Sequence, residues 1–194
     1  MDIPVSVVTE RAAAGLSETV TPQGIIAVCD LVDVQLTHAL EGSPKLVAIG
    51  VHTSDPGNAG TLIRVADAAG ADAVIFAGDT VDPHNGKCVR ASAGSLFHLP
   101  VARVADPLDA VAACRAAGLR AIAADGRAEA DLDAADLRLP TAWLFGSEAH
   151  GLPPEVSARA DLHARVPIYG AAESLNLATA AAVCLYSTAR AQRR

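Results

Sequence analysis

Short, nearly all-apolar runs alternate along this chain with alanine-rich stretches of helical length. A strand that is buried on both faces reads as a continuous apolar run, and such strands are typical of parallel sheets covered by helices. The alternation therefore predicts an α/β fold, with a parallel sheet and helices on both of its faces. The expected strands are 25–29, 46–51, 73–76, 120–123, 142–145 and 164–167. The expected helices are 59–69, 86–95, 107–117 and 174–194.

Residues typical of helix ends flank two of these helices. Gly70 and Gly118 follow them, and a glycine closes a helix C-terminus without the steric cost that other residues incur. Pro107, directly after Asp106, suits the first helical position, where its missing N–H is not needed.

The composition is that of a folded protein. Of 194 residues, 51% are hydrophobic and 19% are charged, and the mean hydropathy is +0.30. These values exclude a chain too polar to bury a core. No basic stretch before an apolar run marks a signal peptide, and the mostly apolar run 175–186 is shorter than the roughly 20 residues of a membrane span. We therefore expect a cytoplasmic protein with no membrane contact.

The cysteines predict neither a disulfide framework nor a metal centre. Cys29, Cys88, Cys114 and Cys184 form no C-x-x-C pair, and their spacing matches no zinc site. We expect free, buried thiols in a reducing compartment and no bound metal.

The net charge of −7 argues against a protein that holds nucleic acid by bulk positive charge. Aromatic residues make up only 3%, so surfaces that could stack bases are scarce as well. A local basic patch is still compatible with both numbers.

The first 22 residues fit the alternating pattern poorly. Residues 5–8 are a candidate strand and residues 9–16 a short helix, followed by a polar loop. So short a segment cannot bury a core of its own. We therefore expect 1–22 to be a linker or the end of a truncated upstream domain, and 23–194 to form the main domain.

Three polar segments follow expected strands and carry the residues that point to chemistry. The first, D-P-G-N-A-G-T-L-I-R, runs from Asp55 to Arg64 after the strand 46–51. Its glycines allow close approach of a backbone or a ligand, and Asn58 suits a helix cap. Arg64 comes one to two turns into the helix, where it suits a phosphate contact near the positive end of the helix dipole.

The second segment, L-F-G-S-E-A-H-G-L-P, lies at the carboxyl end of the strand 142–145, where α/β sheets bind ligands. Glu148 stands between two glycines, which indicates a functional carboxylate, whereas His150 reads more simply as a loop residue. The spacing matches neither a dinucleotide-binding loop, nor a P-loop, nor a nucleophile elbow.

The third segment, V-P-I-Y-G-A-A-E-S-L-N-L, leads from the strand 164–167 into the last helix. Ser174 suits the cap of that helix. Asn176, in its first turn, carries an amide that needs hydrogen-bond partners.

Taken together and in this order, the three segments resemble those of the SpoU-type (TrmH-like) RNA 2′-O-ribose methyltransferases of the SPOUT superfamily. The motifs that carry the resemblance are N-A-G-T-L-I-R, F-G-S-E-A-H-G-L and V-P-I-Y-G-A-A-E-S-L-N, and V-R-A-S-A-G at 89–94 is similar to a further family segment. The resemblance covers about residues 23–186. It implies a parallel sheet whose C-terminal part forms a deep trefoil knot, a feature that proteins otherwise almost never show.

The resemblance also implies the catalytic domain of a homodimeric enzyme that transfers a methyl group from S-adenosylmethionine to a ribose 2′-hydroxyl of RNA. The positions that match the family's catalytic residues are Arg64, Asn58, Glu148, Ser174 and Asn176. The positions that match its cofactor contacts are Leu144, Gly146, Val166, Ile168 and Leu175. The implied RNA contacts are Arg64, Lys87 and Arg90.

The family's proposed proton acceptor matches Arg64, but a guanidinium stays protonated in proteins. We therefore expect Arg64 to hold a phosphate and to stabilise the developing alkoxide. Asn58 is expected to orient Arg64 or the ribose, and Glu148 to pair with Arg64 or to lie near it.

Residues 16–27 resemble the junction between the knot and an N-terminal RNA-binding domain similar to ribosomal protein L30e. Members with that layout mostly modify ribosomal RNA, so we expect a 23S-type ribosomal RNA as the substrate. One alternative is the same reaction on transfer RNA. Another is a non-catalytic RNA-binding knot, which the five polar residues in apolar surroundings argue against. A third alternative is a general nucleotide-binding α/β protein, but this chain lacks the phosphate-binding loops that such a protein needs.

Overall fold

The structure, a computed structural model, describes residues 3–17, 19 and 22–194. It divides into two compact units, Met1–Leu31 and Val32–Arg194. The second unit holds the sheet and all three polar segments. The structural division thus lies after the expected boundary at residue 22, and the origin of 1–22 in an upstream domain stays a prediction.

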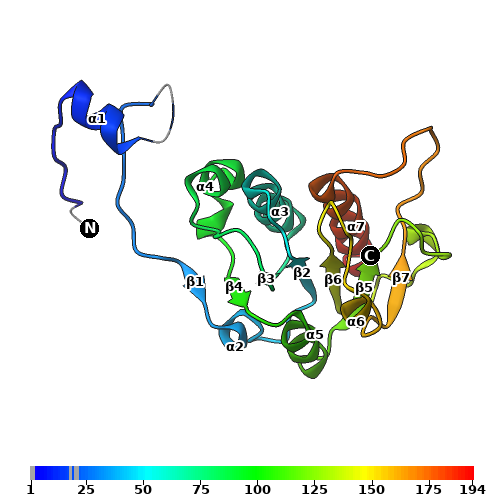
Figure 1. The fold of residues 1–194 in the computed structure, drawn as a ribbon. Coiled ribbons are helices and arrows are strands. Elements are labelled where there is room, and N and C mark those ends of the chain that lie inside the picture. Colours follow the sequence, from blue (N-terminus) through cyan, green and yellow to red (C-terminus); the bar gives the residue numbers. More distant parts are fainter. Residues whose placement is uncertain (1–2, 18, 20–21) are drawn as a thin grey trace. The chain divides into compact units, whose positions relative to one another are not determined.

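The second unit contains a seven-stranded sheet in which all strand pairs are parallel (Figure 1). Its order is β1-β4-β3-β2-β6-β5-β7. The central pair joins strands that are far apart in the sequence, with Leu46 opposite Thr141 and Gly50 opposite Phe145. The strands are β1 (Asp33–Val34), β2 (Leu46–Val51), β3 (Ala73–Ala77), β4 (Val101–Val104), β5 (Arg120–Ala124), β6 (Thr141–Phe145) and β7 (Leu162–Ala164).

Helices cover both faces of the sheet (Figure 1), which confirms the predicted α/β class. None of the helices in the described part of the chain has the length and apolar character needed to cross a bilayer. One face carries α3 (Pro56–Ala69), α4 (Gly86–Ser92), α7 (Leu177–Gln192) and the short turns η1 (Ser95–Phe97) and η2 (Leu132–Ala134). The other face carries α2 (Leu36–Ala39), α5 (Pro107–Ala116) and α6 (Pro154–Ser157).

Trp143 anchors α7 to the centre of the sheet. It is the largest fully buried side chain, and its Nε1–H donates to the Thr188 hydroxyl of α7 at 2.9 Å. That hydroxyl in turn donates to the Cys184 carbonyl at 3.0 Å. A buried indole N–H needs a partner, so this bond selects the rotation of α7 about its axis.

The strands predicted from apolar runs agree with the structure in the centre of the sheet. β2 has the expected range, and β3, β5 and β6 are each one residue longer. β7 ends at Ala164, where the expected strand would have begun. The edge strand β1 and its neighbour β4 were not predicted, because β1 has only two residues and only the first two of the four residues of β4 are buried.

The strand predicted at 25–29 was wrong. These residues are irregular and lie in the first unit, where Ile25 is 89% exposed and Val28 is 101% exposed. The strand predicted at 5–8 is also irregular, while the helix expected over 9–16 is confirmed as α1 (Glu10–Leu16). An apolar run becomes a strand only where a neighbouring strand accepts its hydrogen bonds.

Glycine at position 60 lets α3 and α4 pack closely. A Cβ on Gly60 would lie 2.3 Å from the carbonyl oxygen of Cys88 and 2.7 Å from the Cβ of Ala91. Since no side chain fits in that space, this glycine of the first polar segment serves helix packing.

The chain that leaves β7 lies against the loop between β5 and β6. The Arg165 N–H donates to the Ala130 carbonyl at 3.0 Å, and the Arg165 carbonyl accepts the Leu132 N–H at 2.8 Å. The guanidinium of Arg165 also pairs with Asp131. These contacts attach the chain to the 125–140 loop directly before the third polar segment begins.

Three of the four cysteines are buried as expected, whereas Cys29 is exposed in the first unit. Burial disfavours the thiolate, and it raises the pKa of Cys88 to about 11 and those of Cys114 and Cys184 to about 12. An unfolded chain ionises these thiols near their ordinary pKa of 9.0. The fold holds the three thiols protonated, so its stability falls as the pH rises past that value.

We expect one thiol per native chain to react quickly with a disulfide reagent at pH 8, and all four to react in denaturant, because four free cysteines are present and one is exposed. Spectrophotometric titration with and without urea measures this. A Cys29→Ser variant should lose the fast phase, and a fast phase that persists in that variant would contradict the burial of the other three.

Candidate active site

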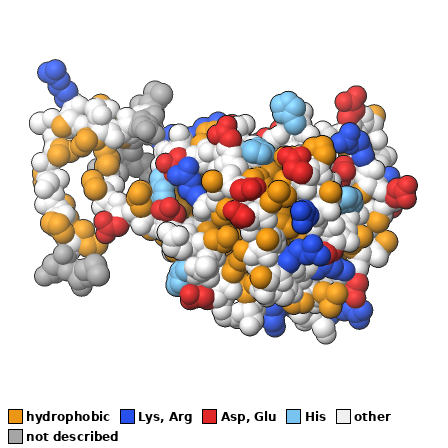
Figure 2. Space-filling view, turned by 60° about the horizontal axis from the view of Figure 1, so that its bottom comes forward, with side chains coloured by type: hydrophobic (Ala, Val, Ile, Leu, Met, Phe, Trp, Pro, Cys, Tyr) orange, Lys and Arg blue, Asp and Glu red, His pale blue; other side chains and the backbone are white. Residues whose placement is uncertain are grey.

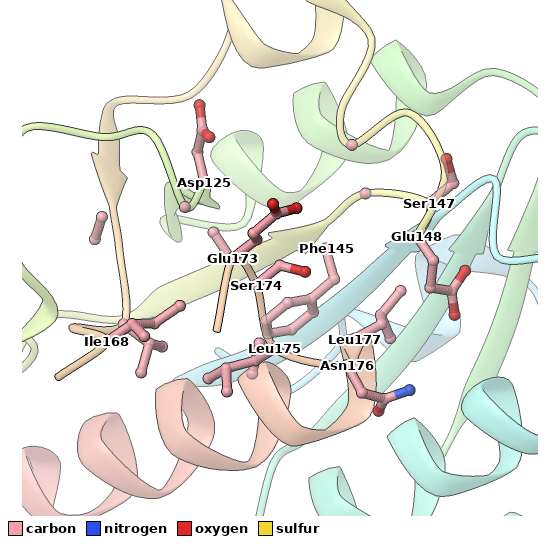
Figure 3. Close-up of a pocket in the computed structure, with 17 residues that line it drawn as sticks. Asp125, Phe145, Ser147, Glu148, Ile168, Glu173, Ser174, Leu175, Asn176 and Leu177 are labelled. Carbon is pink, nitrogen blue, oxygen red and sulfur yellow. The ribbon is translucent and has the colours of Figure 1, made fainter. Parts of the chain in front are cut away.

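The carboxyl ends of β5 and β6, the segment after β7 and the start of α7 enclose a cavity of about 330 Å³ (Figure 3). All three polar segments reach this edge of the sheet, since parallel strands end on the same side. A cavity of this size is typical of small-molecule sites.

Four of the five positions predicted to contact a cofactor line this cavity: Gly146, Val166, Ile168 and Leu175. The fifth, Leu144, does not. Successive residues of a strand point to opposite faces, and the side chain of Leu144 is fully buried on the α5 face of the sheet. Its neighbour Phe145 lines the cavity instead.

The cavity also contains residues that the sequence analysis missed. Asp125 and Gly126 follow β5, and Leu177 and Ala180 belong to α7. Asp125 adds a carboxylate to the same cavity as Glu173 (Figure 3). β5 lies beside β6 in the sheet, and this neighbourhood is not readable from the order of strands in the sequence.

Gly146 is required by a close turn of the backbone. A Cβ there would lie 2.1 Å from the carbonyl carbon of Gly151 and 2.3 Å from the nitrogen of Leu152. Ser147 and Gly151 exchange backbone hydrogen bonds of 3.1 and 2.8 Å, which close the turn that presents Glu148. The second polar segment is therefore a tight backbone loop whose shape depends on glycine.

A row of hydrogen bonds joins one residue from each polar segment. The Asn176 side-chain amide donates to Asn58 Oδ1 at 2.9 Å. The amide of Asn58 donates in turn to the Glu148 carboxylate. Three segments separated by 90 and 118 residues are thereby joined at one corner of the cavity.

The start of α7 determines which atoms donate and which accept in this row of hydrogen bonds. Asn176 Oδ1 accepts the N–H groups of Ala178 and Thr179 at 2.9 and 3.3 Å, so it caps the helix. The amide nitrogen of Asn176 must then point outward, and it meets the carbonyl oxygen of Asn58. The amide nitrogen of Asn58 is therefore directed at Glu148, because an amide has one acceptor end and one donor end.

Two predicted helix caps were wrong. Asp55, not Asn58, caps α3 by accepting the Asn58 N–H at 2.8 Å, and Pro56 occupies the first helical position. Asn176, not Ser174, caps α7. In each case both residues are of types that cap helices, and only the backbone path decides which of them does so.

The structure pairs Glu148 with Asn58 rather than with Arg64. Arg64 is exposed on α3 and forms no hydrogen bond or ion pair with any residue that the structure describes. Lys87 forms an ion pair of 3.1 Å with Asp55. The hydrogen bond from the Asn58 N–H and, after it, this contact with Lys87 lower the pKa of the Asp55 carboxyl group. Arg90 lies in the last turn of α4.

The visible surface has no single basic face. In Figure 2 Lys and Arg side chains are interspersed with Asp and Glu side chains. The net charge of −7 agrees with this mixed surface. On this face, attraction of a polyanion would depend on local cations and not on a broad basic patch.

Comparison with known proteins gives one family. Residues 45–186 match the SpoU rRNA Methylase family. A 23S rRNA (guanosine(2553)-2′-O)-methyltransferase, RlmP, of Bacillus subtilis is 39% identical over 178 residues, which are 92% of this chain and 69% of that protein. A 23S rRNA (uridine(2479)-2′-O)-methyltransferase of Streptomyces viridochromogenes is 36% identical over 174 residues, which are 87% of this chain and 61% of that protein.

A solved structure agrees. An AdoMet-bound rRNA methyltransferase from Sinorhizobium meliloti superimposes with a TM-score of 0.86 at 34% identity, over 94% of this chain and 70% of that one.

This chain belongs to the SpoU rRNA Methylase family. Membership confirms the resemblance drawn from the three motifs and the fold class that it implied. Membership also implies the trefoil knot. The chain spans between three fifths and three quarters of the length of these SpoU relatives.

The SpoU cavity fits S-adenosylmethionine, the cofactor named for the solved relative. Phe145, Ile168 and Leu175 offer apolar surface to an adenine ring. The carboxylates of Asp125 and Glu173 suit the positive charges of a sulfonium and an ammonium group. Volume, apolar lining and charge thus agree with the predicted cofactor.

We expect Asn176→Ala to lower the free energy of unfolding by about 1 kcal/mol or more, because it removes the cap of α7. Ser174→Ala should change it by less than about 0.5 kcal/mol, because Ser174 caps no helix. Urea unfolding of both variants measures this. A larger loss for Ser174→Ala than for Asn176→Ala would reinstate Ser174 as the cap.

Proposed function

We propose that this chain transfers the methyl group of S-adenosylmethionine to the ribose 2′-hydroxyl of a nucleotide in 23S-type ribosomal RNA. The observation that carries the proposal is the row Asn176–Asn58–Glu148 at the corner of the cavity. A hydroxyl group is a poor nucleophile, so the reaction needs an oriented hydrogen-bond acceptor and tight positioning. The row supplies an oriented carboxylate beside the cofactor cavity.

S-adenosylmethionine supplies, when bound, a methyl carbon already activated by the positive sulfur. The chain's own residues bind it and orient the hydroxyl. Gly146, Val166, Ile168 and Leu175 would hold it in the cavity, and the tight turn at Gly146 shapes that wall. The backbone groups of Leu144 remain candidate contacts, although its side chain faces away.

Glu148 is the residue best suited to accept the hydrogen of the 2′-hydroxyl. Its carboxylate accepts one bond from Asn58 and keeps further acceptor capacity. Ser174 and Asn176 line the same cavity and complete the surroundings of the ribose. Since a guanidinium cannot serve as a general base, Arg64 would instead clamp a backbone phosphate, with Lys87 and Arg90 of α4 as further RNA contacts.

Ribosomal RNA is favoured as the substrate because both curated relatives compared above are named as 23S rRNA 2′-O-methyltransferases. Transfer RNA is the second candidate. It is favoured by a solved structure described as methylating C/U34 on tRNA, which is 31% identical and matches over 98% of its own length.

We further propose a cytoplasmic homodimer in which α3 and α7 form the interface. The half-exposed Val183 and Tyr186 of α7 would be covered there. Light scattering measures the mass, and a monomer at micromolar concentration would contradict the dimer.

Residues 1–22 fit the end of an upstream RNA-binding domain, and methyl transfer by a longer protein that contains such a domain tests this.

The test of the function is transfer of a labelled methyl group from S-adenosylmethionine to transcripts of 23S ribosomal RNA and, in parallel, of transfer RNA. Label on the 23S transcript, mapped to a ribose, is the expected result. Label on transfer RNA alone would favour the second substrate. Calorimetric binding of S-adenosylmethionine without transfer to either RNA would favour a non-catalytic RNA-binding domain.

We expect Arg64→Ala to lower methyl transfer at least about a hundredfold, because it removes the cation proposed to clamp the RNA backbone phosphate and to stabilise the developing alkoxide. The affinity for S-adenosylmethionine should change little, since Arg64 does not line the cavity. Calorimetry and labelled transfer measure the two quantities. Arg138→Ala, at the opposite edge of the sheet, is the matched control, and equal loss of binding and transfer in Arg64→Ala would refute the role.

We expect Glu148→Gln to lower kcat about 10² to 10⁴-fold, as is usual for removal of a general base. Glutamine still offers an oxygen to Asn58, so the turn and the stability should be retained. Thermal unfolding and single-turnover transfer measure both. Glu155→Gln on α6 is the control, and a Glu148→Gln enzyme with normal kcat would exclude Glu148 as the acceptor.

A further inference from the structure

A second cavity, of about 310 Å³, adjoins the first across the turn that carries Glu148. Its polar lining comes from His52, Ser54, Asp79, Ser147, Glu148 and His150. Ser147 and Glu148 line both cavities, and Figure 3 shows them at one side of the cofactor cavity. A group bound in the second cavity therefore lies directly beside the carboxylate proposed to meet the ribose.

His52 is held in this cavity in an unusual backbone conformation. Its φ is +51°, a region that residues with a Cβ rarely adopt. Its N–H donates to the Ala77 carbonyl at 3.0 Å, and its ring covers Gly78, where a Cβ would lie 2.4 Å from Cε1. Strained positions that the surroundings hold in place are typical of functional sites.

The tautomer of His52 follows from its contacts. The Asp79 N–H, which can only donate, bonds to Nδ1 at 3.0 Å. The proton of the neutral ring is therefore on Nε2, which has no partner among the described residues. The Asp79 carboxylate likewise forms no hydrogen bond or ion pair within the described part of the chain. The Nε2–H of His52 and the carboxylate of Asp79 are thus both available to a ligand, on two residues that a hydrogen bond joins.

The chemistry of the lining selects the ligand. A phosphate group is disfavoured, because Asp79 and Glu148 both carry negative charge into the cavity. A metal ion is disfavoured too, since the described residues contain no group of three or more histidine, cysteine or acidic side chains that could hold one. A nucleobase offers a flat face on which the His150 ring could stack, and it presents donors and acceptors along its edge to His52 and Asp79.

Guanine is the base whose hydrogen-bonding edge best complements the His52 Nε2–H donor and the Asp79 carboxylate. Its O6 accepts one hydrogen bond, as from His52 Nε2–H, and its adjacent N1–H and N2–H donate together to the two oxygens of one carboxylate, as of Asp79. Adenine, cytosine and uracil each match only two of these three bonds. The second cavity is thus matched in polarity to a guanine.

We propose that the second cavity binds a guanine base of the substrate RNA, with His52 and Asp79 reading its Watson–Crick edge. The inference rests on the proposed methyl transfer to RNA, because that function brings a nucleotide to Glu148. His52 then determines which RNA binds, and the row Asn176–Asn58–Glu148 determines how fast the methyl group moves.

The first experiment compares His52→Asn with His98→Asn, the same change at an exposed histidine that pairs with Asp67 and lines neither cavity. Asparagine tolerates a positive φ, and a second variant, His52→Gly, relieves the strain altogether. Both His52 variants should raise the KM for 23S ribosomal RNA about tenfold or more, while kcat and the affinity for S-adenosylmethionine change much less. Unchanged KM in both variants of an active enzyme would overturn the proposal.

The second experiment needs no turnover, so it separates failure of this inference from failure of the proposed function. The chain, saturated with S-adenosylmethionine, is titrated with each of the four nucleoside 5′-monophosphates, and the imidazole resonance of His52, assigned with His52→Asn, is followed by NMR. We expect GMP to shift it at concentrations about tenfold lower than AMP, CMP or UMP do. An equal response to all four, or none to GMP, would overturn guanine recognition.

Discussion

Parallel pairing of β2 with β6 is the contact on which the site depends. It joins strands almost a hundred residues apart, from Leu46 opposite Thr141 to Gly50 opposite Phe145. Both strands are buried on both faces, so the register is fixed by packing along their whole length. Because parallel strands end together, the pairing brings the loop before Asn58 next to the loop that carries Glu148.

The last helix completes this arrangement through one capping residue. Trp143 of β6 holds Thr188, which selects the face that α7 presents to the sheet. Asn176 then caps α7 and transmits the direction of the helix N–H groups through Asn58 to Glu148. Helix capping, usually a matter of stability, here sets the orientation of two amides at the cavity. Close backbone contacts at Gly60 and Gly146 leave little freedom to this framework.

The sequence predicted the central strands and seven of the residues that line the cavity, because both follow from local patterns. β2, β3, β5 and β6 are continuous apolar runs, and the polar segments directly follow strands. The prediction failed where strand formation depends on a neighbouring strand. Residues 25–29 are as apolar as a strand but have no strand beside them, whereas β4 is a strand because β1 and β3 flank it. The caps of α3 and α7 were misassigned for the same reason, since several capping residues compete within a few positions.

The sequence by itself determined the α/β class, the family and the identity of the polar residues, because apolar periodicity and short motifs are properties of adjacent residues. Only the tertiary structure decided that Glu148 meets Asn58 rather than Arg64 and that Asp125 lines the cavity although the side chain of Leu144 does not. It also placed His52, in its strained backbone conformation, beside Asp79. Each of these depends on which strands are neighbours and on which face a side chain points. The physical reason is that strand order and register are set by packing across the whole sheet, which no local stretch of sequence contains.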